Sequence, residues 1–258
     1  MLRELSLFSG IGGFSLGLER AVLATPVAFV EIDPFCQRVL AKHWPGVPIH
    51  GDVTTREFIE GEADVITGGF PCQDVSLARN GEGLDGARSG LYRELIRAIR
   101  DVRPKLAIVE NSPGLLSRGL GRFLRDLASI GYDAEWHCIP ACAVGAPHER
   151  DRIWIVAYPA CIGHETNPGE NWGASAACIL SDIDLSRCEE QRSPISAFEE
   201  YASAECGSQW ASEPDICRVV YGLSGRVDRL KALGNSVVPQ VVEVIAAALA
   251  RRQSENAG

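Results

Sequence analysis

The sequence predicts an α/β fold in which helices cover both faces of a mostly parallel sheet, in a doubly wound arrangement. Through the first 158 residues, short apolar runs typical of strands alternate with stretches of helical periodicity. A glycine-rich turn follows the first run and opens a helix, as in doubly wound sheets that bind ligands at the carboxyl ends of their strands. The length of 258 residues suffices for one such core and a small second lobe.

Each element follows from a local pattern. Apolar runs predict strands at residues 4–8, 27–31, 63–67, 105–110 and 152–158. Helical periodicity predicts helices at residues 14–23, 34–43, 91–102, 118–130 and 239–251. Pro34 supports the second helix, because proline is favoured in the first turn.

The regular pattern fails after residue 158, which predicts a change in organisation. Residues 159–225 are rich in Ser, Ala, Glu, Cys and Gly and read as a small irregular lobe. This segment has eleven acidic and three basic side chains, a balance of −8 out of the net −9 of the chain. The rest of the chain is therefore close to neutral. We expect a main domain at residues 1–158, the irregular lobe at 159–225, and a return to the main domain at 226–258.

Several classes of protein are not expected from the composition. The N-terminus has no basic-then-apolar signal region, and the apolar run at residues 237–250 is interrupted by Pro239, Gln240 and Glu243. The nine cysteines are an odd number and include no C-x-x-C pair, which favours reduced thiols and argues against a zinc site. We therefore expect a cytoplasmic protein with no membrane association and no metal.

Three features of the first half predict a nucleoside pocket. The turn after the first strand places backbone N–H groups at a helix N-terminus, where they can approach a polar ligand. Glu31 ends the second strand and can accept hydrogen bonds from ribose hydroxyls, and Asp52 can receive an adenine amino group. Either carboxylate by itself fits a solvated strand end, but their order and spacing favour a pocket. Ser15 replaces the third glycine of a dinucleotide fingerprint, which counts against NAD.

The most specific segment is residues 68–76, with Pro71 and Cys72 directly after a predicted strand. It resembles the Pro-Cys motif of the DNA cytosine-5 methyltransferases. Residues 110–114 resemble their Glu-Asn motif, residues 150–152 their paired arginines, residues 233–239 their Gly-Asn motif and residues 8–13 their cofactor loop. The five segments occur in the family's order, and the resemblance covers the chain except for residues 159–225, the position of the family's target-recognition domain.

The resemblance implies a Rossmann-like methyltransferase fold, S-adenosylmethionine as cofactor and a role for each matched residue. Cys72 would add to C6 of cytosine as a thiolate, which makes C5 nucleophilic. Glu110 would hydrogen-bond or protonate N3, which requires a raised pKa. Arg152 would contact the cytosine carbonyl oxygen, and Arg150 would orient the site. The expected cofactor-binding residues are Phe8, Gly10, Ile11, Gly12, Gly13, Glu31, Ile32, Asp52, Val53, Pro71, Asn235 and Ser236.

The expected partner is double-stranded DNA. Because the target base cannot be reached inside a duplex, it must be extruded. The glycine-rich segment at residues 73–90 predicts a loop that closes on the phosphate backbone, and a basic cluster precedes the Gly-Asn motif. A solvated helix face explains that cluster equally well. The candidate DNA-binding residues are Ser76, Arg79, Arg88, Ser89, Arg226 and Arg229.

Some features depart from the family pattern and keep rival functions open. Ser6 stands where the family commonly has Asp, His148 stands where it usually has Gln, and the recognition lobe is short and acidic.

A zinc deaminase is excluded by Val75 and the missing H-x-E motif. A transfer-RNA cytosine methyltransferase shares the catalytic motifs, and a DNA-binding relative with impaired targeting fits the acidic lobe. A small-molecule methyltransferase does not explain Cys72 together with Glu110. A cognate restriction endonuclease is a possible partner, and a monomer is the default state.

Overall fold

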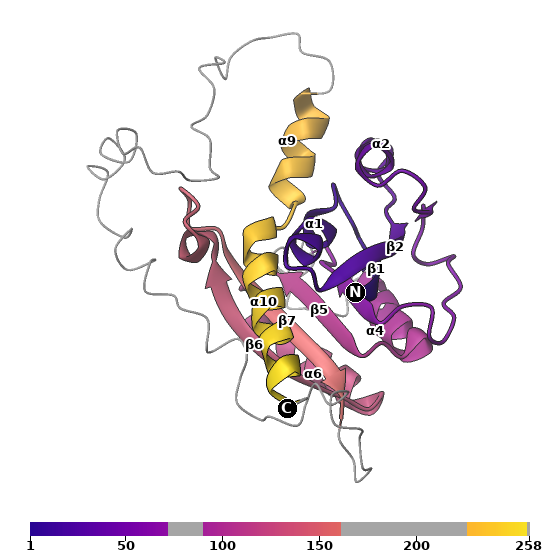
Figure 1. Ribbon diagram of the computed structural model, residues 1–258, viewed down its shortest axis with the longest axis vertical. Helices are drawn as coiled ribbons and strands as arrows, with labels where there is room; N and C mark the ends of the chain where they lie inside the picture. The colour runs from indigo at the N-terminus through magenta and orange to yellow at the C-terminus, as the bar shows by residue number, and fades with distance from the viewer. Residues whose placement is uncertain (72–89, 161–225, 257–258) are drawn as a thin grey trace, which may run out of the picture.

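Seven strands form a single sheet in the computed structural model, which describes residues 1–71, 90–160 and 226–256 (Figure 1). The strands are β1 (Leu2–Leu7), β2 (Ala24–Val30), β3 (Ile49–His50), β4 (Val65–Gly68), β5 (Leu106–Asn111), β6 (Tyr132–Pro140) and β7 (Asp151–Pro159). The helices are α1 (Gly13–Arg20), α2 (Pro34–His43), α4 (Gly90–Val102), α5 (Leu115–Arg118), α6 (Leu120–Ser129), the 3₁₀-helix η2 (Ala141–Val144), α9 (Arg226–Asn235) and α10 (Pro239–Asn256).

The strand order is β3-β2-β1-β4-β5-β7-β6. The pairs among β1, β2, β3, β4 and β5 are parallel, whereas β7 runs antiparallel to both β5 and β6. The order reverses direction between β1 and β4, and ligands bind at such switch points in doubly wound sheets. The predicted fold class, a mostly parallel doubly wound sheet, is confirmed.

Alternating side chains of the strands build two hydrophobic cores, one on each face of the sheet. On one face, Leu5 and Leu7 of β1 pack with apolar residues of α4 and α6. On the other face, Phe14 and Leu18 of α1 pack with residues of α10, which crosses the sheet (Figure 1). Gly17 allows α1 and α10 to approach, because a Cβ there would lie 2.5 Å from the carbonyl oxygen of Pro239.

The structure differs from the predicted elements in several places, and helix α9 was not predicted. Strands β3 and β6 were not predicted; β6 is partly solvated along its length and lacks the apolar run of a buried strand. The helix predicted at residues 118–130 is α6, which begins at Leu120, and the short helix α5, which was not predicted, precedes it. Helix α1 ends at Arg20, because Val22 has a φ of 57° and directs the chain into β2.

The C-terminal helix is part of the core. Residues 231–252 are long and apolar enough to cross a membrane by length and composition alone, with a mean hydropathy of 1.5. In α10, however, Val242, Ile245 and Leu249 are fully buried against the sheet and α1. The composition of this helix is therefore explained by core packing.

The thiols of the described residues are not all reduced. Cys36 and Cys138 are free, whereas Cys142 is in a disulfide, which corrects the expectation of uniformly reduced thiols.

Candidate active site

The predicted site residues meet at one edge of the sheet because the strands that precede them are parallel. Phe8 follows β1, Glu31 follows β2, and Pro71 lies three residues after the end of β4. Glu110 is the penultimate residue of β5. The carboxyl ends of parallel strands lie side by side, so residues distant in sequence share this edge.

The cofactor loop between β1 and α1 is held by two close packing contacts. Gly12 has a φ of +87°, and a Cβ there would lie 2.4 Å from Cζ3 of Trp44. At Gly13 a Cβ would lie 2.8 Å from Cγ2 of Val237, so the Gly-Asn segment lies directly against the loop. Gly10 has a φ of +54° and open space around its Cβ position, which leaves room for a ligand beside the backbone.

Glu31 links β2 to this loop. Its Oε2 accepts a hydrogen bond from the Gly10 N–H at 2.6 Å, and its Oε1 accepts one from the Asp33 N–H at 2.8 Å. Each carboxylate oxygen can accept a further hydrogen bond, so the predicted contact with ribose hydroxyls remains compatible with this geometry. Ile32, the next residue, is 70% exposed.

Asp52 lies on the loop between β3 and β4. Its Oδ1 accepts hydrogen bonds from the N–H and the hydroxyl of Thr54, both at 2.8 Å. The backbone hydrogen bond and then the side-chain hydrogen bond lower the pKa of Asp52, which keeps it an ionised acceptor. The neighbouring Val53 is buried in the core, which anchors the loop.

A cavity of about 500 Å³ opens where the cofactor loop, the paired-arginine segment and the Gly-Asn segment meet. Its lining includes the predicted cofactor residues Ile11, Gly12, Gly13 and Ser236, together with Arg150. The cavity therefore brings together three segments that are more than 80 residues apart in the sequence. Its lining combines glycine backbone with half-buried apolar groups.

Glu110 and Arg152 form the charged centre of the site. Nε of Arg152 lies 2.8 Å from Oε1 of Glu110, and the Glu110 residue is 8% exposed. Burial raises the pKa of Glu110, although the charges of Arg152 and Arg150 oppose this shift. Gly69 leaves room for the carboxyl group, since a Cβ there would lie 3.0 Å from Oε2 of Glu110. Gly69, three residues before Cys72, thus lies against the carboxyl group of Glu110.

Arg150 has a supporting position. Its Nη2 donates to the carbonyl oxygens of Gly234 and Ser236 at 3.0 and 2.7 Å. Its backbone φ of 32° is unusual for a non-glycine residue, as often found at functional sites. These contacts join the paired arginines to the Gly-Asn segment, in which Asn235 ends α9 and is exposed.

Asn111, the last residue of β5, was predicted only as part of the Glu-Asn motif, and the structure shows that it is buried next to Glu110 in the chain. Its Nδ2 donates to the carbonyl oxygen of Phe70 at 3.0 Å, and its Oδ1 accepts from the Ser112 N–H at 2.8 Å. Because Phe70 is two residues before Cys72, this buried amide anchors the backbone that leads to the predicted nucleophile. A buried polar residue at a strand end was the available signal.

Several predicted residues lie outside the described ranges: Cys72, Ser76, Arg79, Arg88 and Ser89. Arg226 and Arg229 lie on α9, but their side chains are not among those described. Lys231, in the same basic cluster, forms an ion pair with Asp33 at 3.1 Å, so this cluster also contacts the N-terminus of α2.

Comparison with known proteins agrees with this geometry. Residues 2–175 match the sequence model of the C-5 cytosine-specific DNA methylases, and the chain belongs to this family. It is 37% identical over 164 residues to the Type II methyltransferase M2.BsuMI of Bacillus subtilis, covering 60% of this chain and 42% of the relative. It is 32% identical over 240 residues to M.Eco47II of Escherichia coli, covering 85% of this chain and 56% of the relative.

Solved structures show the same fold. A prophage-encoded E. coli protein described as a DNA modification methyltransferase is 27% identical, with a TM-score of 0.51 over 62% of this chain and 47% of that chain. Spodoptera frugiperda DNMT2 is 20% identical, with a TM-score of 0.52 over 65% of this chain and 53% of that chain, a likeness of fold. The chain thus spans about half the length of most of the relatives described here.

Proposed function

We propose that this chain transfers a methyl group from S-adenosylmethionine to C5 of an extruded cytosine in double-stranded DNA. The observation that carries the proposal is the buried Glu110 with its raised pKa, paired with Arg152 and packed against Gly69 just before Cys72. A carboxyl group that keeps its proton can donate to a ring nitrogen, and the adjacent guanidinium can bind the carbonyl oxygen of the same ring.

The chain's own residues account for the activation of the base. The Cys72 thiolate forms a bond from Sγ to C6, and the C5–C6 π electrons move into the ring. Glu110 supplies a hydrogen bond or a proton at N3, which neutralises the developing charge and leaves C5 nucleophilic. Arg152 fixes the ring through its carbonyl oxygen. When bound, S-adenosylmethionine supplies an electrophilic methyl group. The C5 proton is then lost to solvent, the C5–C6 double bond forms again as the thiolate is expelled, and the proton at N3 returns to Glu110.

The cofactor would be held by the edge formed from three strand ends. Glu31 would accept hydrogen bonds from the ribose hydroxyls, Asp52 would accept one from the adenine amino group, and the backbone of residues 10–13 lines the cavity beside them. The open space at Gly10 and the exposed Ile32 support this placement. Phe8, with a φ of 51°, Val53, Pro71, Asn235 and Ser236 complete the proposed contacts.

The remaining roles follow from the position of the segments. Residues 159–225 would form the target-recognition lobe and residues 226–258 would return to the catalytic domain. Because this lobe is acidic, we propose that contacts with the DNA backbone come from Ser76, Arg79, Arg88, Ser89, Arg226 and Arg229. The names of the Type II relatives support a proposal of DNA modification alongside a restriction endonuclease.

A trapping experiment tests this function. The protein is incubated with labelled S-adenosylmethionine and duplexes that contain 5-fluorocytosine in many sequence contexts. Fluorine at C5 prevents the final elimination, so a labelled covalent adduct should accumulate, and Cys72→Ser should abolish it. Mapping the adduct would give the target sequence. An adduct on transfer RNA but not on DNA would contradict the proposed substrate, and no adduct on either, despite cofactor binding, would contradict the chemistry.

A further inference from the structure

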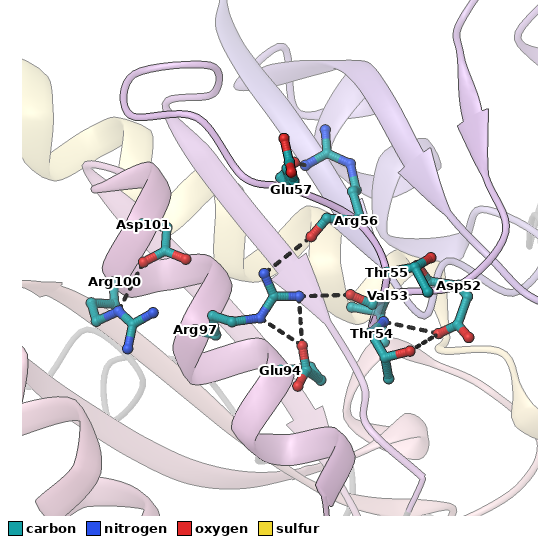
Figure 2. Close-up of polar contacts among 10 residues, drawn as sticks. All are labelled: Asp52, Val53, Thr54, Thr55, Arg56, Glu57, Glu94, Arg97, Arg100 and Asp101. Carbon is teal, nitrogen blue, oxygen red and sulfur yellow. Dashed lines mark hydrogen bonds and ion pairs between the residues drawn. The ribbon is translucent and has the colours of Figure 1, made fainter.

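Arg97 of α4 is held close to the loop that carries Asp52 and Val53 (Figure 2). Its Nη2 donates to the carbonyl oxygen of Val53 at 2.8 Å, and its Nη1 donates to that of Arg56 at 3.0 Å. One planar guanidinium therefore binds two backbone carbonyls of the same loop, three residues apart. This bidentate geometry fixes the path of the loop in a way that a single-point donor cannot.

The guanidinium is itself fixed from two further sides. Oε2 of Glu94, one turn earlier on α4, lies 2.7 Å from Nε and 2.6 Å from Nη2 of Arg97. The Cζ of Arg97 lies 4.6 Å from the centre of the Phe58 ring, and the Cζ of Arg56 lies 4.8 Å from the same ring centre. Arg56 in turn forms two hydrogen bonds with Glu62 at 2.8 and 2.9 Å. The loop is thus tied to α4 by an ordered polar and aromatic cluster.

The cluster lies next to the proposed adenine contact. Asp52 directly precedes Val53, whose carbonyl Arg97 binds, and its carboxylate is oriented by the turn at Thr54 (Figure 2). Helix α4 also begins at Gly90, the first described residue after the segment that starts at Cys72. Arg97 therefore connects the helix that follows the nucleophile segment to the loop of the adenine acceptor.

We propose that Arg97 is a positioning residue for cofactor recognition: it holds the loop at residues 52–56 so that Asp52 can receive the adenine 6-amino group. This inference rests on the proposed function, because it assumes that S-adenosylmethionine occupies this edge. It adds a residue on a different element, which contacts the loop backbone and acts through Asp52. Removal of the Arg97 contacts with the loop should weaken recognition of the amino group while leaving the methyl-transfer chemistry in place.

The same helix offers a matched control. Arg100, one turn further along α4, pairs with Asp101 at 2.8 Å, and its side chain is 57% exposed. Figure 2 shows this pair apart from the Arg97 contacts with the loop. Arg100→Met removes the same charge and the same number of donors from the same helix. It should therefore report any effect of helix charge or helix propensity alone.

Calorimetric binding separates positioning from general stability. The ligands are S-adenosylhomocysteine and its analogue with hydrogen in place of the 6-amino group, measured with the full chain. We expect Arg97→Met to weaken the first ligand about tenfold and the second by less than twofold. Arg97→Lys keeps the positive charge but cannot bind two carbonyl groups in a bidentate manner, so it should behave like Arg97→Met. It replaces Arg97→Met in the test if that variant does not fold. Arg100→Met should match the unchanged protein.

Asp52→Asn completes the test through a double-mutant cycle. If Arg97 acts through Asp52, the double variant should bind S-adenosylhomocysteine no more than twofold worse than either single variant. At saturating cofactor, kcat of Arg97→Met should stay within about threefold, with the loss confined to KM for the cofactor. Equal weakening of both ligands, or no weakening of either, would overturn the inference while the proposed function stands. If the unchanged protein binds neither ligand, the proposed function itself fails.

Discussion

Arg152 and Glu110 face each other across the antiparallel pair β5–β7, with Nε of the arginine 2.8 Å from Oε1 of the carboxyl group. The ion pair is close, yet burial raises the pKa of Glu110 against the pull of two arginines. Desolvation thus outweighs charge attraction here, so Glu110 keeps its proton to a higher pH than an ordinary carboxyl group does. The pair consequently combines a proton donor and a fixed cation within one site.

Replacement of Glu110 by Gln should leave the fold intact and lower kcat for methyl transfer by a factor on the order of 100 or more. Gln has nearly the same shape and can donate a weak hydrogen bond, but it cannot give a proton to N3. Because the pKa of Glu110 is raised, its share of the activity should decline as pH rises through that pKa, and this decline should be missing from the residual activity of Glu110→Gln. Rates measured across pH at saturating substrates check this.

Arg152→Met provides the matched comparison. Removal of the adjacent cation should raise the pKa of Glu110 further, so the alkaline decline should move to higher pH, although the rate itself falls. A decline at unchanged pH in this variant would show that Glu110 is not the titrating group.

Asn111 should control the nucleophile rather than the cofactor. Asn111→Asp keeps the acceptor for the Ser112 N–H but cannot donate to the carbonyl of Phe70, so the approach to Pro71 and Cys72 loses its anchor. We expect the rate of adduct formation with 5-fluorocytosine DNA to fall about tenfold or more, with cofactor affinity unchanged within twofold. Ser112→Ala, which retains the backbone N–H, is the control. A loss of cofactor affinity equal to the loss of rate would contradict this role.

The sequence predicted the central sheet because its buried parallel strands are continuous apolar runs. It missed β6, an edge strand whose partial exposure gives mixed polarity. Glu31 and the turn at Gly10 were predicted from the local patterns of strand ends and glycine turns, whereas Glu110 was predicted from the resemblance to a family. The fold brings these three residues to one edge. Arg97 could not be predicted as part of the site. Its position in an amphipathic helix fits a solvated face, and its carbonyl partners lie 41 and 44 residues away.

Two glycines of the cofactor loop should respond differently to alanine. At Gly12 the new Cβ would meet the Trp44 ring at 2.4 Å with φ at +87°, so Gly12→Ala should destabilise the fold by about 1–3 kcal/mol. At Gly10 the Cβ meets no atom within 4 Å, and the strain of its positive φ is the main cost, about 1 kcal/mol. If the space beside Gly10 holds the cofactor, Gly10→Ala should weaken cofactor binding about tenfold. Denaturant titration and calorimetry distinguish the two effects; equal affinity in Gly10→Ala and unchanged protein would place the cofactor elsewhere.

Glu4 predicts a pH dependence of stability that is separate from catalysis. It is fully buried in β1, accepts a hydrogen bond from Thr67 at 2.6 Å, and desolvation raises its pKa to about 7. Between the unfolded pKa and this folded value, the folded state holds a proton that the unfolded state has released. Stability is therefore greatest at low pH within this window and declines as pH rises from about 4.5 to about 7, by roughly 3 kcal/mol in total.

Glu4→Gln should remove this decline. The free energy of unfolding of the variant minus that of the unchanged protein should therefore be larger at pH 8 than at pH 5. Glu62→Gln is the control: burial is outweighed there by the hydrogen bond and charge of Arg56, and the pKa of Glu62 is lowered. Its effect should thus be constant from pH 5 to pH 8. Urea unfolding at each pH gives the comparison. Parallel curves for Glu4→Gln and the unchanged protein would mean that Glu4 keeps the same protonation state when the chain unfolds.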